Sequence, residues 1–190
     1  MTKVASPRGV VRERVLQAAL ELFAEYGVSG TSLQMIADRV GVAKASVYYQ
    51  FHTKEDIVLT LISPVFDDIA RLVKIADAVG SDEARRDVAI SGLVELAVRN
   101  RSLTTVFFGD PAIDPLVRSH DEFAAAIEGF DALVVGPAPD DATRVAMSVI
   151  TAGIYGTAIN PQLVDVSDDD LHRMLLKTTK CLLAALAPRA

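Results

Sequence analysis

Apolar residues recur at three- and four-residue spacing along most of the chain, which is the pattern of amphipathic helices. The expected helices cover roughly residues 10–26, 32–40, 44–51, 54–79, 82–100, 102–108, 115–135, 140–158 and 168–186. Glycine and proline breaks separate several of them, for example at 109–111, 136–137 and 160–161. No stretch of useful length alternates apolar and polar residues as a strand does. The pattern therefore predicts an all-α protein of about nine helices.

Two of the expected helices are short and are separated by only three residues. Thr31-x-x-Gln34 fits a capping box, in which each side chain satisfies the other residue's amide, so the first helix is expected to begin there. Its apolar residues share one face until Gly41 supplies the left-handed conformation that ends a helix. The next helix must begin at Lys44. Helices joined by so tight a turn must cross steeply.

A steeply crossed helix pair is typical of DNA-reading motifs, whose second helix enters a major groove about 12 Å wide. We expect Val47, Tyr48 and Phe51 to face inward. Five residues are expected to face outward: Lys44, Ala45, Ser46, Tyr49 and Gln50. Lysine neutralises phosphates or donates to guanine, serine donates or accepts, and alanine permits close approach to a thymine methyl. The alternative is that the two helices simply form part of a helical bundle.

The N-terminal quarter of the chain resembles the TetR/AcrR family of bacterial transcriptional regulators. The resemblance rests on short signals in a fixed order: Ala19-Leu20-Glu21-Leu22-Phe23, Tyr26-Gly27, Thr31-Ser32, Ile36-Ala37, Gly41-Val42, Val47-Tyr48-Tyr49, Phe51, Lys54-Glu55 and Ile57. It implies a three-helix helix-turn-helix DNA-binding domain, expected over 8–54 with its reading motif at 32–51. It also implies a helical ligand-binding and dimerisation domain, expected over 55–190, together with a homodimer and a small-molecule inducer.

The residues expected to contact DNA lie in and around the two short helices. They are Thr31, Ser32, Gln34, Ala43, Lys44, Ala45, Ser46, Tyr48, Tyr49, His52 and Lys54. Lys54 is expected to contact a phosphate, because a lysine in the first turn of a helix opposes the helix dipole. Ala43 stands where the family often has a serine or threonine cap, so we expect the helix after it to become firmer on DNA. Arg8, Arg12 and Arg14 are expected either to reach flanking phosphates or to form a solvated helix start.

The charge distribution is compatible with a DNA-binding head on an acidic body. The chain carries a net charge of −6, yet residues 1–54 hold seven basic and four acidic residues, a net +3. DNA binding requires basic residues near the phosphates, and an acidic body would direct DNA to the basic end. The single Cys181 excludes an internal disulfide and offers no metal site. With neither a signal peptide nor a membrane-spanning stretch expected, a cytoplasmic protein is predicted.

The last two long helices are expected to form the homodimer. In the first of them, small and apolar residues share one face: Ala142, Val145, Ala146, Val149, Gly153 and Gly156. In the second, an apolar seam is formed by Leu171, Leu175, Thr178, Leu182 and Ala185. Two subunits would pair these faces in a four-helix interface, as a palindromic operator requires. The alternative is that both faces pack within one chain.

A ligand cavity is expected between the helices of the second domain. Its candidate residues are Phe66, Phe107, Phe108, His120, Phe123, Met147 and Tyr155, an apolar wall that would suit a small apolar or amphipathic effector. The alternative is that these aromatic residues and His120 are ordinary core. Asp168, Asp169 and Asp170 are interpreted as helix-start residues rather than metal ligands. The helix that follows residue 54 joins the two domains and contains Pro64, which is expected to kink it.

Nothing in the sequence indicates an enzyme, because no phosphate loop, nucleophile elbow or paired catalytic residues are present. No cofactor is expected. The predicted function is a dimeric repressor that a small-molecule inducer releases from a palindromic operator. Two alternatives stay open: a regulator without small-molecule control, and a helical protein-interaction module with a vestigial DNA-binding head.

Overall fold

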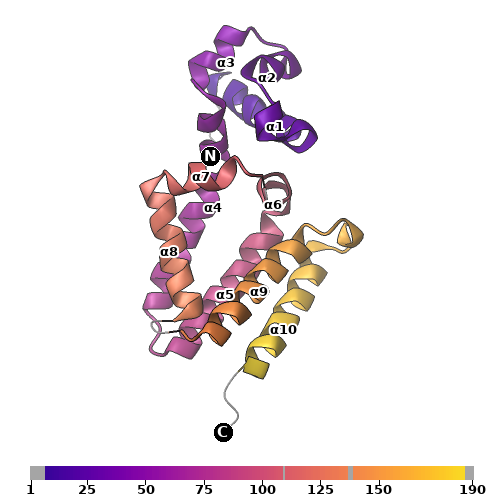
Figure 1. Ribbon diagram of the computed structural model, residues 1–190. Helices are drawn as coiled ribbons and strands as arrows, with labels where there is room; N and C mark the ends of the chain where they lie inside the picture. Colours follow the sequence, from indigo (N-terminus) through magenta and orange to yellow (C-terminus); the bar gives the residue numbers. More distant parts are fainter. Residues whose placement is uncertain (1–6, 109, 137–138, 187–190) are drawn as a thin grey trace, which may run out of the picture. The chain divides into compact units, whose positions relative to one another are not determined.

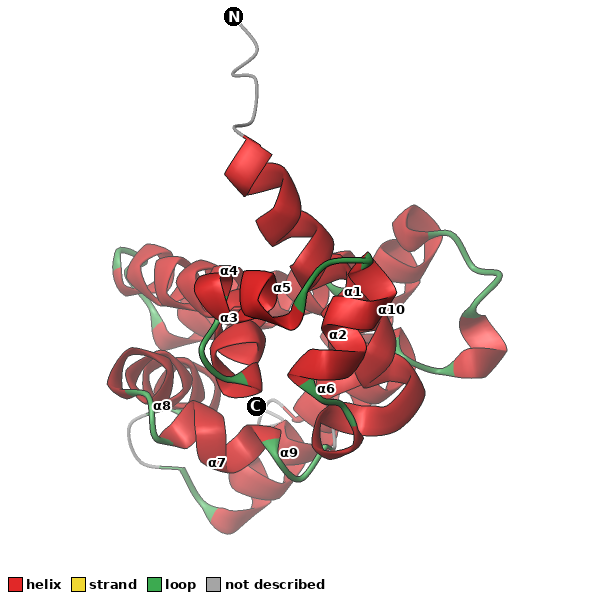
Figure 2. Ribbon diagram, turned by 90° about the horizontal axis from the view of Figure 1, so that it is seen from above, coloured by secondary structure: helices red, strands yellow, loops and turns green. Residues whose placement is uncertain are grey.

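The computed structural model describes residues 7–108, 110–136 and 139–186, and every regular element within them is a helix (Figures 1 and 2). The helices are α1 (Pro7–Gly30), α2 (Leu33–Val40), α3 (Lys44–Gln50), α4 (Lys54–Asp77), α5 (Asp82–Arg99), α6 (Arg101–Phe107), α7 (Ile113–Arg118), α8 (Asp121–Val135), α9 (Asp141–Ala158), the 3-10 helix η1 (Pro161–Leu163) and α10 (Asp168–Leu186). The all-α prediction is confirmed.

The helix expected over 115–135 is two helices, α7 and α8, which accounts for the one α-helix beyond the predicted nine. Ser119 ends α7, and its hydroxyl donates to the carbonyl of Leu116 at 2.8 Å. His120 has an extended backbone, and its carbonyl accepts the first bonds of α8 from Phe123 and Ala124. A serine that bonds its own backbone competes with helix continuation. The apolar spacing runs on across this break and therefore hides it.

The chain forms two compact units. The first comprises residues up to Ser63 together with Thr105–Ser119, and the second comprises Pro64–Thr104 and the residues from His120 onward. The sequence prediction divides the chain once, at 54/55, whereas these units interleave. Helix α4 crosses from one unit to the other at Pro64, which lies inside the helix without an N–H to donate.

In the first unit, α1 packs against α2 and α2 against α3 (Figure 1). The core consists of residues from all three helices: Val15, Ala19, Leu22, Phe23, Ile36, Ala37 and Val47. Regular helix geometry in α1 is interrupted at Gly27, where φ is 71°. Tyr26, near the end of α1, is 55% exposed.

In the second unit, α5 is the central helix and contacts α8, α9 and α10. Its buried residues include Ile90, Leu93, Val94 and Ala97. Leu72 of α4 packs so closely on Gly92 that a Cβ there would lie 2.5 Å from both Leu72 methyl carbons. Arg101 holds the α9–α10 connection, donating to the carbonyls of Ala158, Leu163 and Val166 and to the Asp168 carboxylate. The unit is thus built around α5.

Candidate nucleic-acid interface

Helix α2 begins one residue later than the capping-box prediction requires. Its cap is Ser32, whose hydroxyl oxygen accepts the Met35 N–H at 3.2 Å. Thr31 is only 3% exposed, and its hydroxyl lies 2.9 Å from the Gly27 carbonyl and 3.2 Å from that of Leu22. The predicted capping role of Thr31 is therefore wrong, because its hydroxyl is turned inward to satisfy the end of α1.

Gln34 does not complete a capping box either. Its side-chain amide donates to Asp38 at 2.7 Å, one turn further along the exposed side of α2. The other expected end of the helix is confirmed: Gly41 has φ 76° and ψ 37°, and its N–H donates to the carbonyl of Ala37 at 2.9 Å. Glycine adopts this left-handed conformation without steric cost. The tight turn between α2 and α3 thus forms as predicted.

Helix α3 begins at Lys44 and has no side-chain cap. Ala43 is extended, with φ −64° and ψ 143°, and offers no side-chain acceptor to the first amides of the helix, although its carbonyl accepts the Ser46 N–H at 2.8 Å. The expected departure from the family pattern is therefore a structural fact. Since a missing cap costs a helix about 0.5–2 kcal/mol, α3 begins with less local support than α2.

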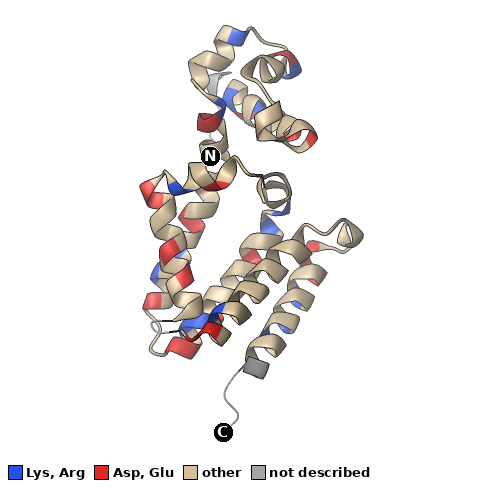
Figure 3. Ribbon diagram, in the orientation of Figure 1, with Lys and Arg blue, Asp and Glu red and all other residues tan. Residues whose placement is uncertain are grey.

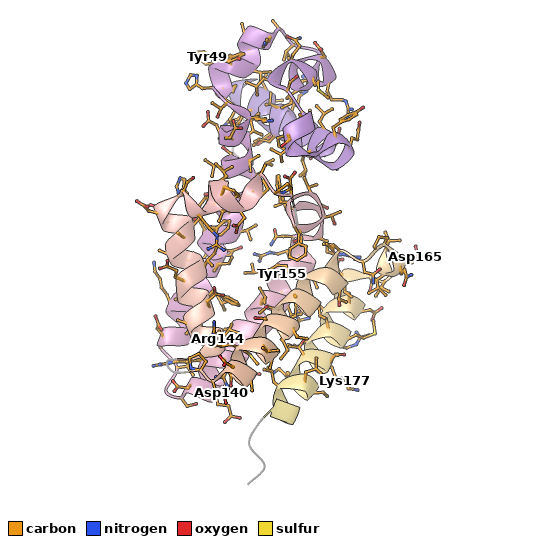
Figure 4. The ribbon with its side chains drawn as sticks, in the orientation of Figure 1. Tyr49, Asp140, Arg144, Tyr155, Asp165 and Lys177 are labelled. Atoms are coloured by element: carbon orange, nitrogen blue, oxygen red, sulfur yellow. The ribbon has the colours of Figure 1, made fainter. Side chains whose placement is uncertain are left out.

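The outward face of α3 is open. Lys44, Ala45 and Ser46 are exposed, and Tyr49 projects from the helix with 72% of its surface accessible (Figure 4). Val47 and Phe51 are buried as expected. Tyr48, expected on the inward face, is 44% exposed, and the Lys44 ammonium lies 5.5 Å from the centre of its ring. Tyr48 thus joins the exposed surface of α3.

Figure 3 marks the basic and acidic positions along the ribbon. Several basic residues of the first unit already have protein partners. Arg39 pairs with Glu25 at 3.0 Å and Glu21 at 3.4 Å; its hydrogen bond lowers the pKa of Glu25, and the pair raises the pKa of Arg39. Arg14 donates to the Val40 carbonyl at 2.7 Å, and the Arg12 guanidinium lies 4.9 Å from the Phe51 ring centre. Both arginines therefore brace the unit. The predicted role of Arg8 falls on a side chain outside the described residues.

The start of α4 is a capping box. The Asp56 N–H donates to the Thr53 hydroxyl oxygen at 3.0 Å, and the Asp56 carboxylate accepts the N–H groups of Thr53 at 3.0 Å and of His52 at 3.1 Å. The His52 side chain is exposed. Thr53 thus caps α4.

The ammonium of Lys54, which was expected to contact a phosphate, has hydrogen-bond partners within the first unit, and the residue is half-buried. Its Nζ donates to the carbonyl of Val28 at 2.8 Å and lies 3.4 Å from the Ser29 carbonyl and 3.5 Å from that of Thr31. These carbonyls end α1 and precede α2, so they attract the charge in the absence of DNA. A phosphate would have to compete with them.

One segment of the first unit was assigned by sequence to a ligand cavity. Phe107 is 7% exposed, and its ring centre lies 6.0 Å from that of Phe23 on α1. Phe107 is therefore core of the first unit, while Phe108 is 49% exposed. Nearby, Asp110 accepts the Val28 N–H at 3.1 Å, a contact that sequence reasoning missed because Gly109-Asp110-Pro111 reads only as a helix break.

Three of the predicted ligand residues do come together in the second unit. The Phe66 and Phe123 rings stack at 4.4 Å and 12°, and His120 stacks on Phe123 at 4.4 Å and 21°. The Nδ1 atom of His120 is buried, and no described residue hydrogen-bonds to it. A buried polar atom without a partner is uncommon in a folded protein. These three residues form the aromatic cluster referred to below.

The remaining two ligand candidates lie on α9. Met147 is 4% exposed and belongs to the core around α5, and Tyr155 packs against the same core. Tyr155 is half-buried, and this burial, followed by the nearby negative charge of Asp131, raises the pKa of its phenol to about 12 (Figure 4). The two residues thus pack as core residues do, with one polar handle on the tyrosine.

A cavity of about 900 Å³ opens elsewhere in the second unit, between α5, α9 and α10. It is lined by Glu83, Ala84, Arg86, Asp87, Asp140, Ala142, Thr143, Ala146, Met147, Lys180, Leu183 and Ala184. Met147 is the one predicted ligand residue among them. The sequence contains no signal for this cavity, because small and charged residues from three distant helices line it.

Other chemistry is not indicated by the described part of the chain. Asp170 accepts the Ser167 hydroxyl and pairs with Arg173, which lowers its pKa, and Asp168 pairs with Arg101 at 2.9 Å. The described residues contain no cluster of three or more side chains suited to hold a metal ion. None of the helices described is long and apolar enough to cross a membrane.

The α2–α3 pair around Gly41 defines a helix-turn-helix protein, and comparison with known proteins agrees. Residues 15–61 match the family described as bacterial regulatory proteins, tetR family. The regulator YezE of Bacillus subtilis is 37% identical over 81 residues, 42% of each chain, and the IcaR negative regulator of the biofilm operon icaADBC of Staphylococcus aureus is 33% identical over 63 residues, 33% of this chain and 34% of IcaR. The matched part thus spans less than half of these relatives.

A solved structure resembles nearly the whole fold. The transcriptional regulator FadR of Bacillus subtilis, solved in complex with stearoyl-CoA, aligns with a TM-score of 0.60 at 21% identity, covering 92% of this chain and 98% of FadR. The family model thus identifies residues 15–61 as a DNA-binding domain of the tetR family type, and the similarity to FadR shows that the chain shares its fold. Its relatives are regulators and not enzymes.

Proposed function

We propose that the protein is a dimeric DNA-binding repressor whose α3 reads a palindromic operator and which a small molecule releases. The observation that carries the DNA-binding part is the exposure of Lys44, Ser46 and Tyr49 on α3. These side chains supply a cation, a hydroxyl and a phenol, the groups that contact phosphates and base edges. Repression is favoured because the relative IcaR is a negative regulator.

DNA selected from a random pool by the full chain tests this part of the proposal. Binding should weaken as salt rises, and the selected sequence should have two-fold symmetry. Tyr49→Ala should lower the affinity for that sequence by about 1–3 kcal/mol if the ring or hydroxyl meets a base edge. Tyr26→Ala is the matched control, because Tyr26 is an exposed tyrosine of the same unit on α1. Equal losses in both variants would remove Tyr49 from the reading surface.

The dimer part rests on an open apolar face of α9. Val145 and Val149 are each 64% exposed, and Gly153 and Gly156 have no neighbour within 4 Å of an added Cβ. The seam expected on α10 divides: Leu171 and Leu175 are buried within the chain, whereas Leu182 is 49% exposed. Thr178 is exposed, and the side chain of Ala185 lies outside the described residues. An apolar helix face of this kind favours a second copy of the same face.

Val149→Asp tests the dimer. Light scattering coupled to size-exclusion chromatography should show the wild type as a dimer and the variant as a monomer. Ile75→Asp is the control, because Ile75 is 54% exposed on α4 and does not belong to the α9 face. A dimer that survives Val149→Asp, or a wild type that is monomeric at micromolar concentration, would refute this interface.

The effector part rests on the aromatic cluster. Stacked rings beside a buried, unpartnered imidazole nitrogen favour an apolar or amphipathic molecule that brings one hydrogen-bonding group. Stearoyl-CoA, the molecule in complex with FadR, is a probe of that class. This effector class is supported if stearoyl-CoA releases the selected DNA while CoA alone does not. The Phe123→Ala variant should no longer respond to stearoyl-CoA. No release by either compound favours a regulator without such control.

A vestigial head on an interaction module is the remaining alternative. It predicts that the full chain selects no DNA sequence above background, even at low salt. As a regulator that must reach chromosomal DNA, the protein is proposed to act in the cytoplasm.

A further inference from the structure

The junction between α1 and α2, residues 27–31, is held by side chains from distant parts of the first unit. Val28 is 3% exposed and lies at the centre of the junction. Its N–H donates to the Asp110 carboxylate at 3.1 Å, and its carbonyl accepts from the Lys54 ammonium at 2.8 Å. Both polar groups of this buried residue are therefore bonded to charged side chains, 82 and 26 residues away, and the carbonyl also accepts the Thr31 N–H at 3.3 Å.

Asp110 is itself fixed in place. Its second carboxylate oxygen accepts the Ala112 N–H at 2.9 Å, and its own N–H donates to the Phe107 carbonyl. Phe107 packs on Phe23, one turn before the junction. Phe107 and Asp110 thus reach the end of α1 with one apolar and one polar contact. A Cβ at Gly27 would lie 3.7 Å from the Asp110 carboxylate, so this side chain approaches the α1 backbone closely.

The geometry of the junction decides where α3 lies. Helix α2 starts directly after it, with the Ser32 cap, and α2 packs on both α1 and α3. The direction in which the chain leaves Val28 therefore sets the angle of α2, and α2 carries the turn that orients α3. Neither Asp110 nor Lys54 lies on α3 itself. Any influence that they have on DNA reading acts through this junction.

We propose that Asp110 and Lys54 are positioning residues for DNA reading, which orient the α2–α3 pair by holding the N–H and the carbonyl of Val28. The DNA-reading part of this inference rests on the proposed function. The structural part does not, because the rigidity of the junction is measurable without DNA. Loss of Asp110 leaves a buried N–H unsatisfied, a penalty that corresponds to about 5- to 150-fold in a local opening equilibrium.

Amide hydrogen exchange of the free, full-length protein is the first measurement. In Asp110→Ala, the amides of residues 28–40 should exchange about 5- to 150-fold faster, while those of the α5 core stay unchanged. Asp114→Ala is the matched control, since Asp114 lies in the same unit and pairs with the exposed Arg118. The role of Asp110 would be overturned if only the amides of residues 110–119 exchanged faster, while those of residues 28–40 exchanged as they do in Asp114→Ala.

DNA affinity is the second measurement, made on the sequence that the full chain selects. Asp110→Ala should bind it several-fold more weakly than Asp114→Ala, because a head with a misdirected α3 is partly incompetent. Equal binding by the two variants would overturn the positioning role. If the wild type selects no DNA, the proposed function fails while the exchange result still decides whether the junction is held. Where Asp110→Ala is unfolded, Asp110→Asn replaces it, retaining one acceptor and giving a smaller effect in the same direction.

Lys54→Met separates positioning from phosphate binding. The methionine retains an apolar stem of similar length but no ammonium. Positioning predicts faster exchange at 28–40, and combination with Asp110→Ala should give less than the sum of the single effects, because both act on Val28. The Lys54 half of the proposal would be overturned by a different pair of results in Lys54→Met. Amide exchange at residues 28–40 would be unchanged, and the salt dependence of DNA affinity would fall by the amount that about one phosphate contact contributes.

Discussion

A serine at position 43 should stabilise the reading helix before DNA arrives. Ala43 already has the extended backbone of a cap residue, and the first amides of α3 receive no side-chain acceptor. A serine hydroxyl at this position would supply an acceptor for the Ala45 amide, whereas the Ser46 amide already donates to the carbonyl of residue 43 at 2.8 Å. Caps of this kind contribute about 0.5–2 kcal/mol, or roughly 2- to 30-fold in the helix-forming equilibrium. Ala43→Ser should therefore slow amide exchange at residues 44–50 by that factor in the free protein.

The same exchange measurement in the presence of DNA shows whether the uncapped N-terminus of α3 matters for function. In the wild type, we expect the selected DNA to slow exchange at 44–50, because contact with DNA stabilises a helix that begins without a cap. In Ala43→Ser this additional slowing should be smaller. Equally slow exchange with and without DNA in the wild type would refute the reasoning.

Ser32→Ala is the matched control for the cap effect. It removes the cap that α2 possesses, with its 3.2 Å bond from Met35, and should accelerate exchange over 33–40 by about 2- to 30-fold. If Ser32→Ala accelerates α2 as expected while Ala43→Ser leaves α3 unchanged, the start of α3 is not its weak point.

Two further predictions concern the second unit. Gly92→Ala should lower the free energy of unfolding by about 1–3 kcal/mol in urea titration, because its Cβ would lie 2.5 Å from the Leu72 methyl carbons. Gly129→Ala, with its nearest neighbour at 3.3 Å, should cost less, and an equal cost would refute the packing argument. Because the pKa of Tyr155 is raised from 10 to about 12, the stability that its neutral phenol contributes is present below pH 10 and is lost as pH rises toward 12. Between pH 10 and 12, the free energy of unfolding of Tyr155→Phe should therefore fall by about 1–3 kcal/mol less than that of the wild type. An identical decline of both proteins in thermal unfolding scans would show that the phenol is not desolvated.

Local signals in the sequence predicted the features that depend on neighbouring residues. The Gly41 turn and the start of α3 without a side-chain cap formed as expected, and the Thr53–Asp56 box is a feature of the same local kind. Each is decided within four residues by backbone hydrogen bonds and by the conformations that a residue type allows. Where two adjacent residues were equally able to cap, as Thr31 and Ser32 were, local chemistry did not choose between them.

That choice was made by tertiary contacts. Thr31 turned inward because the carbonyls of Leu22 and Gly27 required a donor, which left Ser32 to cap α2. In the same way, the Lys54 ammonium donates to the carbonyls around Val28. A pattern of apolar spacing reports which face of a helix is buried, but it does not report what that face meets.

The sequence by itself determined an all-helical chain with a helix-turn-helix near its start, because helix periodicity and turn chemistry are local properties. Only the tertiary structure decided that residues 105–119 belong with that motif, that Phe107 is core there, and that Asp110 holds Val28. The physical reason is that a hydrogen bond between residues 82 apart is set by how the helices pack, and no signal of such a contact exists in the segments themselves.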